Sequence, residues 1–238
     1  MKTYFLDPKS IRNLFDSIAP RYDLLNHLLS LRRDVYWRRM AVRELGGVEG
    51  WVLDIATGTG DVATEIIHGN GRKNRVVGLD FSEAMIKGAR LKLVKDDLAE
   101  RIVLSLGDAL SLPFRNNTFS ASIIAFGLRN IVQKDQAVSE MVRVVRGGGK
   151  VIILEFTLPR KGVMKSLFPI YFRRILPWVG GLISGDRGAY AYLPESVIHF
   201  QHVENYEGIM KRAGLENVRS SQLTGGVASI IEGTKEPQ

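Results

Sequence analysis

The stretch WVLDIATGTGDVA, which begins at Trp51, constrains the fold more than any other part of this sequence. It opens with an apolar run that predicts a buried parallel strand ending at Asp54, and a helix is expected to begin at about Asp61. The turn between them contains Gly58 and Gly60. Because glycine adopts positive φ without strain and has no side chain to clash with a ligand, this strand, turn and helix predict a site for a nucleotide-type ligand.

Two kinds of ligand fit the pattern Gly58-x-Gly60-x-x-Ala63, which is a weak signal on its own. Dinucleotides and S-adenosylmethionine both contain ribose, and Asp80, 20 residues after Gly60, suits either. Asp54 distinguishes between the two ligands, because a carboxylate beside the turn repels the pyrophosphate of a dinucleotide but attracts the cationic amino-acid group of S-adenosylmethionine. The alternative is that Asp54 and the glycines only form the turn. S-adenosylmethionine is therefore the expected cofactor.

The composition indicates a globular protein and argues against several other classes. The chain has 238 residues, 45% hydrophobic and 24% charged, which suits one globular α/β domain with an insertion. It lacks a run of roughly 20 apolar residues such as a membrane span needs. Because it contains no cysteine and only four scattered histidines, we expect a cytoplasmic protein without disulfides and without a metal site.

Positive charge is concentrated in two segments. Of the net charge of +8, residues 1–50 contribute nine basic and six acidic residues, and residues 158–198 contribute six and two. Residues 158–198 also interrupt the alternation of strands and helices with aromatic, apolar runs, which indicates an inserted cap. Its stretch 167–183 suits a lipid interface, so peripheral association with the inner face of a membrane is expected. The alternative is that these aromatic residues only cover the site.

Hydrophobic periodicity predicts the other elements. Helices are expected to end near Pro20 and to span 24–29, 35–45 and 203–213. Strands are expected over 76–79, 102–106, 119–125 and 151–154, with a terminal hairpin over 217–223 and 227–233. A further helix over 134–146 is expected to be terminated by the three glycines 147–149.

Polar residues follow the carboxyl ends of these strands, where parallel sheets bind their ligands. Asp80 can accept hydrogen bonds from both ribose hydroxyls. Asp108 and the backbone of Ala109 can contact an adenine ring, although Asp108 also suits a structural turn. The segment Phe126-Gly127-Leu128-Arg129-Asn130 follows strand 119–125 at the same edge.

The order of these elements resembles the class I S-adenosylmethionine-dependent methyltransferase fold over residues 50–235. The resemblance implies a Rossmann-like α/β fold with a seven-stranded, mostly parallel sheet and a closing antiparallel hairpin. Three regions are expected: N-terminal helices over the active site (1–50), the cofactor-binding core (51–157 and 199–238) and the aromatic, basic cap (158–198).

Motifs over nearly the whole chain are similar to those of the ubiquinone/menaquinone biosynthesis C-methyltransferases. They are Tyr22-Asp23-Leu24-Leu25-Asn26 with Ser30 and Trp37, Phe126 to Asn130, Arg143 to Gly149 with Glu155, Gly185-Asp186, Tyr190-x-Tyr192-Leu193-x-Glu195-Ser196, and Leu223 to Val227. The resemblance makes Thr59, Asp80, Asp108 and Ala109 cofactor residues, with Ala125 at a position that is serine in some members. The candidate substrate contacts are Tyr22, Phe126, Tyr190 and Tyr192.

The chain departs from the family pattern at a few positions. Leu25 stands where methionine is usual, Asp34 where histidine is usual, Arg146-Gly147 where Lys-Pro is usual, and Thr157 where serine is usual. Because Asp34 changes the charge, the role of the family histidine is not carried over to it.

The resemblance implies methylation of a ring carbon on a prenylated hydroquinone, with demethylmenaquinol as the first candidate. A ring hydroxyl with a pKa of about 10, like that of tyrosine, must lose or share its proton to make the carbon nucleophilic. Arg129 is expected to stabilise the phenolate and Asn130 to orient it. The candidate proton acceptors are Asp61, Asp186 and His199. Each also has a structural interpretation: Arg129 as partner of an acid, Asp61 as a helix cap, Asp186 in a turn, and His199 on a helix face.

Two other classes of function remain open. The basic segments would suit a nucleic-acid methyltransferase or binder, but they are mixed with apolar runs that a phosphate backbone cannot use, and the chain has no Asn/Asp-Pro-Pro-Tyr motif for a flipped base. A cofactor-binding regulator would not need Arg129, Asn130 or the cap. The type of quinol ring, the length of its tail and the choice between monomer and homodimer stay open.

Overall fold

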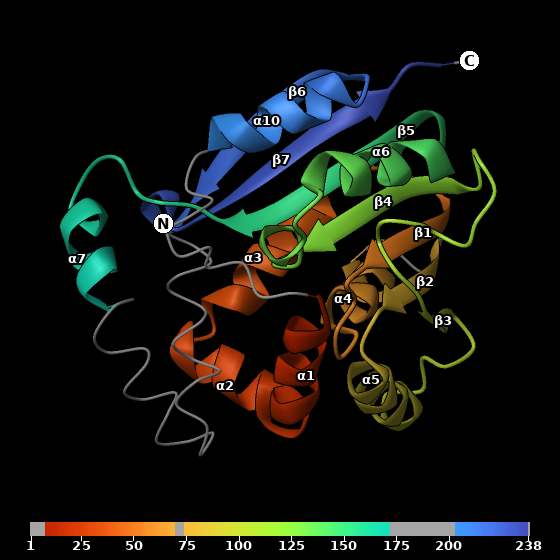
Figure 1. The fold of residues 1–238 in the computed structure, drawn as a ribbon, viewed down its shortest axis with the longest axis horizontal. Coiled ribbons are helices and arrows are strands. Elements are labelled where there is room, and N and C mark those ends of the chain that lie inside the picture. The colour runs from red at the N-terminus through yellow and green to blue at the C-terminus, as the bar shows by residue number, and fades with distance from the viewer. Residues whose placement is uncertain (1–7, 70–73, 172–202, 238) are drawn as a thin grey trace.

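A seven-stranded sheet is the centre of the fold (Figure 1). The structure, a computed structural model, describes residues 8–69, 74–171 and 203–237. The strands are β1 (Gly50–Ile55), β2 (Asn74–Asp80), β3 (Ile102–Leu106), β4 (Phe119–Ala125), β5 (Val145–Phe156), β6 (Leu215–Leu223) and β7 (Ala228–Lys235), in the order β3-β2-β1-β4-β5-β7-β6. The strands β1 to β5 pair in parallel, and β7 runs antiparallel between β5 and β6. The predicted sheet with its closing hairpin is confirmed.

Helices lie on both faces of this sheet and at its carboxyl edge. They are α1 (Pro8–Ile18), α2 (Tyr22–Leu29), α3 (Arg33–Arg43), α4 (Asp61–Gly69), α5 (Glu83–Lys95), α6 (Lys134–Val144), α7 (Met164–Ile170) and α10 (Val203–Arg212). Successive residues of a strand point to opposite faces, so Val52 and Ile123 join a core cluster with side chains of α2 to α5. Leu53 and Ile124 join the other cluster, with α6 and α10.

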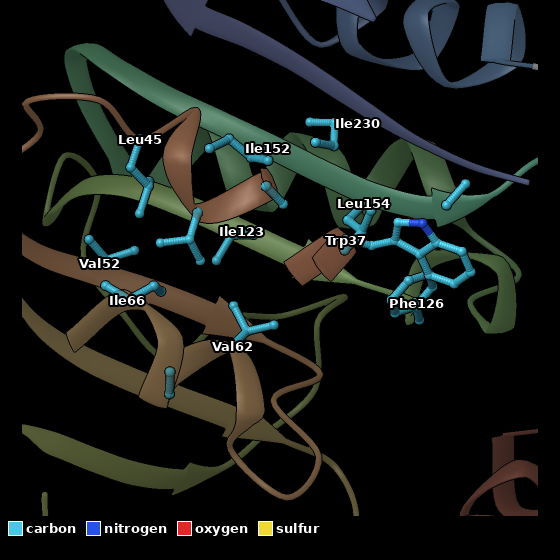
Figure 2. Packing of buried hydrophobic residues seen from close by; sticks show 14 of the residues in the cluster. Trp37, Leu45, Val52, Val62, Ile66, Ile123, Phe126, Ile152, Leu154 and Ile230 are labelled. Carbon is cyan, nitrogen blue, oxygen red and sulfur yellow. The ribbon is translucent and has the colours of Figure 1, made fainter. Parts of the chain in front are cut away.

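The first cluster reaches the carboxyl edge of the sheet through aromatic residues. Figure 2 shows Trp37 of α3 beside Phe126, which follows β4. The ring centroids of these two residues are 6.0 Å apart, and those of Phe126 and Phe156 are 4.7 Å apart. The Trp37 indole also donates a hydrogen bond of 2.8 Å to the hydroxyl of Thr224, between β6 and β7. Buried packing therefore fixes α3 to the ends of β4, β5 and β6.

One predicted boundary is wrong. Helix α6 ends at Val144, and the three glycines lie inside β5, which begins at Val145. The glycines do not stop the helix but allow two strands to approach closely: a Cβ on Gly149 would lie 2.6 Å from the carbonyl oxygen of Ser120 in β4. The glycine run therefore permits a strand where periodicity predicted the end of a helix.

The predicted cap is described only in part. Residues 158–171 include α7, and the remainder, including most of the stretch 167–183, lies outside the described residues. Among the described helices, none is both long and apolar enough to cross a membrane. In Figure 1 the arrowheads of β4 and β5 point to the side of the molecule where α2 and α7 lie.

Candidate active site

A cavity that is open to solvent lies at the carboxyl edge of the sheet. Eight residues that the sequence predicted for the site line it: Tyr22, Gly58, Asp80, Asp108, Ala109, Ala125, Phe126 and Asn130. They come from α2 and from the turns after β1, β2, β3 and β4. Strand order brings these distant positions together, because the carboxyl ends of parallel neighbours share one edge.

The glycine turn is held by the carboxylate at the end of β2. Gly58 and Gly60 have φ of +57° and +84°, which glycine adopts without strain. The N–H of Gly58 donates to Asp80 Oδ2 at 2.8 Å, and the N–H of Ser82 donates to Asp80 Oδ1 at 2.9 Å. Burial raises the pKa of Asp80 above its usual range, against the opposing effect of these N–H groups. Asp80 is thus fixed in orientation, with further lone pairs on each oxygen to accept ribose hydroxyls.

Asp54 lies behind the turn rather than on the cavity wall. Its Oδ2 atom accepts hydrogen bonds from the Thr57 hydroxyl at 2.5 Å and the Ala63 N–H at 3.1 Å. Its Oδ1 atom is buried and has no hydrogen-bond partner among the described residues. Because Asp54 is buried and does not line the cavity, these contacts favour the structural interpretation, in which Asp54 holds the turn.

Burial of Asp54 gives a prediction for stability. Burial raises its pKa from 3.8 to about 7, so the folded protein holds this proton more tightly than the unfolded chain. The stabilisation is therefore complete below about pH 4 and is lost as pH rises through about 7. Relative to Asp54→Asn, we expect the unfolding free energy of the cofactor-free protein to fall by about 2–4 kcal/mol across this range. Urea unfolding at several pH values measures it, with the exposed Asp96→Asn as control; parallel curves for wild type and Asp54→Asn would contradict it.

Asp61, a predicted proton acceptor, is held between two cations. It begins α4 and pairs with Arg38 at 3.1 Å and with Lys92. Burial would raise the pKa of Asp61, but the charges of Arg38 and Lys92 outweigh it and lower the pKa. Lys92 also pairs with Asp23 of α2 at 3.0 Å, and Asp23 accepts a hydrogen bond of 2.5 Å from the Thr59 hydroxyl. A low pKa argues against proton uptake by Asp61 and favours a role in fixing α2 to the glycine turn.

Asp34 is the centre of a buried polar cluster. It contacts His27 at 2.7 Å, the Ser30 hydroxyl at 2.5 Å and Arg38 at 2.6 Å. Burial would raise the pKa of Asp34, but the Ser30 hydrogen bond and the Arg38 charge lower it. His27, Asp34 and Asp61 could place ligand atoms within 4.8 Å of one another, but the Arg38 guanidinium already forms ion pairs with both carboxylates. Arg38, together with Lys92 at Asp61, therefore supplies the positive charge of this cluster.

The N-terminal helices supply part of the cavity wall. Ile11, Arg12 and Phe15 of α1 line it, and sequence reasoning did not name them as site residues. The Phe15 ring lies 6.2 Å from that of Tyr22 and 6.4 Å from that of Phe81. Burial raises the pKa of Tyr22, although nearby Arg38 and Arg129 lower it. The apolar face of α1 was visible as helical periodicity, but periodicity does not say that this face covers a ligand site.

Arg129 does not line the cavity. Its guanidinium pairs with Glu155 at 2.6 Å, donates to the carbonyl oxygen of Phe126, and lies 5.3 Å from the centre of the Phe156 ring. Its backbone N–H donates to the other Glu155 oxygen at 3.0 Å. These contacts match the structural interpretation of Arg129, because they fix the turn that presents Asn130 to the cavity.

Four predicted site residues, Asp186, Tyr190, Tyr192 and His199, lie outside the described residues. Thr59 and Gly60 are described and lie in the glycine turn, where Thr59 is buried against Asp23. Other residues of the cavity wall that the sequence did not single out include Phe81 and Met85. The position of Phe81, directly after Asp80, was the available signal for it.

Solved structures with this fold include methyltransferases. A protein of Methanococcus maripaludis assigned as an S-adenosyl-L-methionine-dependent methyltransferase aligns with a TM-score of 0.67 and 18% identity, over 94% of this chain and 95% of that one. Phosphoethanolamine N-methyltransferase 2 of Haemonchus contortus, in complex with S-adenosyl-L-methionine, aligns with a TM-score of 0.60 and 16% identity, over 84% of this chain and 52% of that one. At these identities the likeness establishes the fold alone.

Sequence relatives are far more similar. The ubiquinone/menaquinone biosynthesis C-methyltransferase UbiE of Geobacter sp. (strain M21) is 46% identical over 226 residues, 94% of this chain and 96% of that protein. The demethylmenaquinone methyltransferase of Bacteroides fragilis is 39% identical over 239 residues, 99% of this chain and 97% of that protein. These relatives confirm the predicted methyltransferase and do not support the nucleic-acid alternative. A model of the ubiE/COQ5 methyltransferase family matches residues 3–235, so the chain belongs to this family of S-adenosylmethionine-dependent enzymes.

Proposed function

We propose that the chain methylates a ring carbon of a prenylated hydroquinone, with demethylmenaquinol as its substrate. The cavity carries the proposal, because one space is lined by the carboxylates of Asp80 and Asp108 and also by Tyr22, Phe126 and Asn130. The carboxylates suit the ribose and adenine of the cofactor, and the aromatic rings with an amide suit a flat ring bearing hydroxyls. The name of the Bacteroides fragilis relative, demethylmenaquinone methyltransferase, supports a naphthoquinol rather than a benzoquinol.

The residues then have distinct roles. S-adenosylmethionine, when bound, supplies a methyl group on a positively charged sulfur. Tyr22 and Phe126 hold the quinol ring by packing, and the Asn130 amide orients a ring hydroxyl, so that the adjacent ring carbon becomes nucleophilic as the hydroxyl loses its proton. Arg129 acts through Asn130 and the turn that carries it, as a positioning residue. Asp186 and His199 remain the proposed proton acceptors.

The substrate also bears on the regions and location of the protein. A prenylated quinol dissolves in a lipid bilayer, so we propose peripheral association with the inner face of the membrane. Residues 1–50 and 158–198 would then cover the active site of a core formed by 51–157 and 199–238. The packing of Phe168 supports the proposal that these two segments cover the site together, because Phe168 belongs to the core cluster that also contains Leu25 and Leu29 of α2.

The proposed function is tested by label transfer. We expect the protein, given S-adenosylmethionine labelled in its methyl group, to label demethylmenaquinol in vesicles at least tenfold faster than a demethoxy benzoquinol with the same tail, a difference of about 1.4 kcal/mol in the barrier. Asn130→Ala, which should bind the cofactor normally, is the matched variant and should be slower with either ring. Equal labelling of both rings would contradict the choice of substrate, and labelling of neither would contradict the function.

A further inference from the structure

Helix α2 presents a leucine face to solvent. Leu24 is 60% exposed, Leu28 is 45% exposed and Leu31, which follows the helix, is 79% exposed. Residues spaced by four in a helix share a face, so Leu24 and Leu28 are neighbours, and Leu31 is exposed just beyond the end of the helix. We call Leu24, Leu28 and Leu31 the leucine face. Three exposed leucines in one stretch need an explanation, because exposed apolar patches mark interaction sites.

The side chains on the other sides of α2 already contact other parts of the protein. Leu25 and Leu29 are buried in the core, and Tyr22 lines the cavity. Asp23 bonds Thr59 and Lys92, and His27 bonds Asp34. The leucine face is therefore the one side of α2 without a described partner, and it belongs to a helix that contributes directly to the proposed substrate cavity.

Arginines flank the leucine face at both ends. Arg21 precedes α2, and Arg32 and Arg33 follow Leu31; all three are exposed. The carboxylates of the same stretch are engaged elsewhere, Asp23 with Lys92 and Asp34 with Arg38. The outer surface of this stretch is therefore apolar with a cationic border. A second copy of the chain would bring like charges together, whereas a bilayer with anionic headgroups offers acyl chains to the leucines and phosphates to the arginines.

The turn after α2 has an unfavourable backbone. Leu31 and Arg32 both have positive φ, +52° and +59°, although neither is glycine or asparagine. The turn is held by backbone hydrogen bonds, including one of 2.7 Å from the Arg32 N–H to the His27 carbonyl oxygen. A glycine would fit this turn without strain, so the leucine and the arginine are consistent with a function for their side chains.

Helix α7 extends the same kind of surface. Val163 is 72% exposed and Leu167 is 52% exposed, beside the exposed Lys161 and Lys165. The hydroxyl of Tyr171, which follows α7, donates to the carbonyl oxygen of Leu29 at the end of α2. Figure 1 shows both helices on the side to which β4 and β5 point.

We propose that the leucine face with Arg32 and Arg33 is a docking surface for a lipid bilayer that carries anionic headgroups. Docking there brings α2, and with it the cavity wall at Tyr22, to the membrane that dissolves a prenylated quinol. The inference rests on the proposed function for the reason to dock, but vesicle binding tests it without any turnover.

The test is flotation of the full chain with vesicles, in the presence of S-adenosylmethionine. We expect binding to vesicles of phosphatidylcholine with phosphatidylglycerol, and little binding to phosphatidylcholine alone. The triple variant Leu24→Ser, Leu28→Ser, Leu31→Ser should weaken binding on the order of a hundredfold. Arg32→Glu with Arg33→Glu should weaken it on the order of tenfold or more and remove the preference for anionic lipid.

A matched control removes apolar surface elsewhere. Leu91 and Val94 of α5 are 76% and 67% exposed, so Leu91→Ser with Val94→Ser should bind vesicles like the wild type. Cofactor affinity and melting temperature should be unchanged in every variant. Wild-type protein that does not bind anionic vesicles, or a triple variant that binds as well as the control, would overturn the proposal. The proposal would also be overturned if the wild-type protein is a dimer and the leucine substitutions convert it to a monomer, because the leucine face would then bind a second copy of the chain.

Turnover separates this proposal from the proposed function. With demethylmenaquinol in vesicles, the triple leucine variant should be at least about tenfold slower than wild type, and with a short-tailed, water-soluble quinol it should be as fast. Vesicle binding through the leucine face without turnover of either quinol would leave the docking surface standing and contradict the function. If the triple variant turns over both quinols at wild-type rates, the proposed function stands and the docking surface is contradicted.

Discussion

Replacing Asp80 by alanine is expected to weaken S-adenosylmethionine binding by about 2–4 kcal/mol, on the order of a hundredfold in Kd, while the fold persists. Asp80 is 4% exposed, lines the cavity and is oriented by the N–H groups of Gly58 and Ser82. A carboxylate fixed in this way loses little entropy when it accepts two ribose hydroxyls. Titration calorimetry with a check of thermal unfolding measures the effect, and unchanged affinity would remove Asp80 from the site.

A modified cofactor distinguishes a lost ribose contact from a loosened glycine turn. If Asp80 accepts the ribose hydroxyls, the wild-type protein should bind the 2′-deoxy analogue of the cofactor more weakly than the parent compound. Asp80→Ala should then bind the two compounds about equally. A variant that still prefers the parent compound by the wild-type factor would show that Asp80 acts only on the turn, through its hydrogen bond with Gly58.

Replacing Arg129 by methionine is expected to lower the free energy of unfolding by about 3–5 kcal/mol, the largest stability change predicted for this protein. Glu155 is fully buried, and its pair with Arg129 measures 2.6 Å, so the substitution leaves a buried carboxylate without its cation. Urea unfolding measures the change. The double variant Arg129→Met, Glu155→Gln should lose less than the sum of the two single variants, because each single change already breaks the pair.

Arg129→Lys tests the catalytic interpretation of the same residue. Sequence alone favoured a phenolate stabiliser, for which lysine should lower kcat on the order of 10²-fold with normal cofactor affinity. The buried pair with Glu155 favours the structural interpretation, in which lysine lowers the melting temperature and turnover falls modestly. Full thermal stability together with a hundredfold loss of kcat would restore the catalytic role.

Sequence alone could predict the parts of the site that depend on strand order. Asp80, Asp108 and Asn130 each follow an apolar strand, and parallel strands bring their carboxyl ends to one edge. The pairing of Arg129 with Glu155 could be predicted in the same way. The strands β4 and β5 are neighbours, Glu155 lies near the end of β5, and Arg129 follows the end of β4. The burial of this ion pair could not be predicted, since it depends on the aromatic packing of Phe126 and Phe156.

Other features could not be predicted because they depend on contacts between distant elements. The glycines 147–149 read as the end of a helix, and the reason they form a strand is the backbone of Ser120, on a different strand. The covering position of α1 likewise depends on its contact with Phe81 and on the hydrogen bond of 2.5 Å from Ser82 to Asp16. Local periodicity contains no information about either partner.

The position of β7 has a consequence for how the protein is made. Strand β7, near the end of the sequence, lies inside the sheet between β5 and β6. While the ribosome is still translating, β5 therefore has an open edge, and the buried side chains that Ile230 and Ile231 contribute to the two core clusters are missing. Such an edge can pair with other chains, so we expect the nascent protein to be prone to edge-to-edge pairing until β7 has joined the sheet.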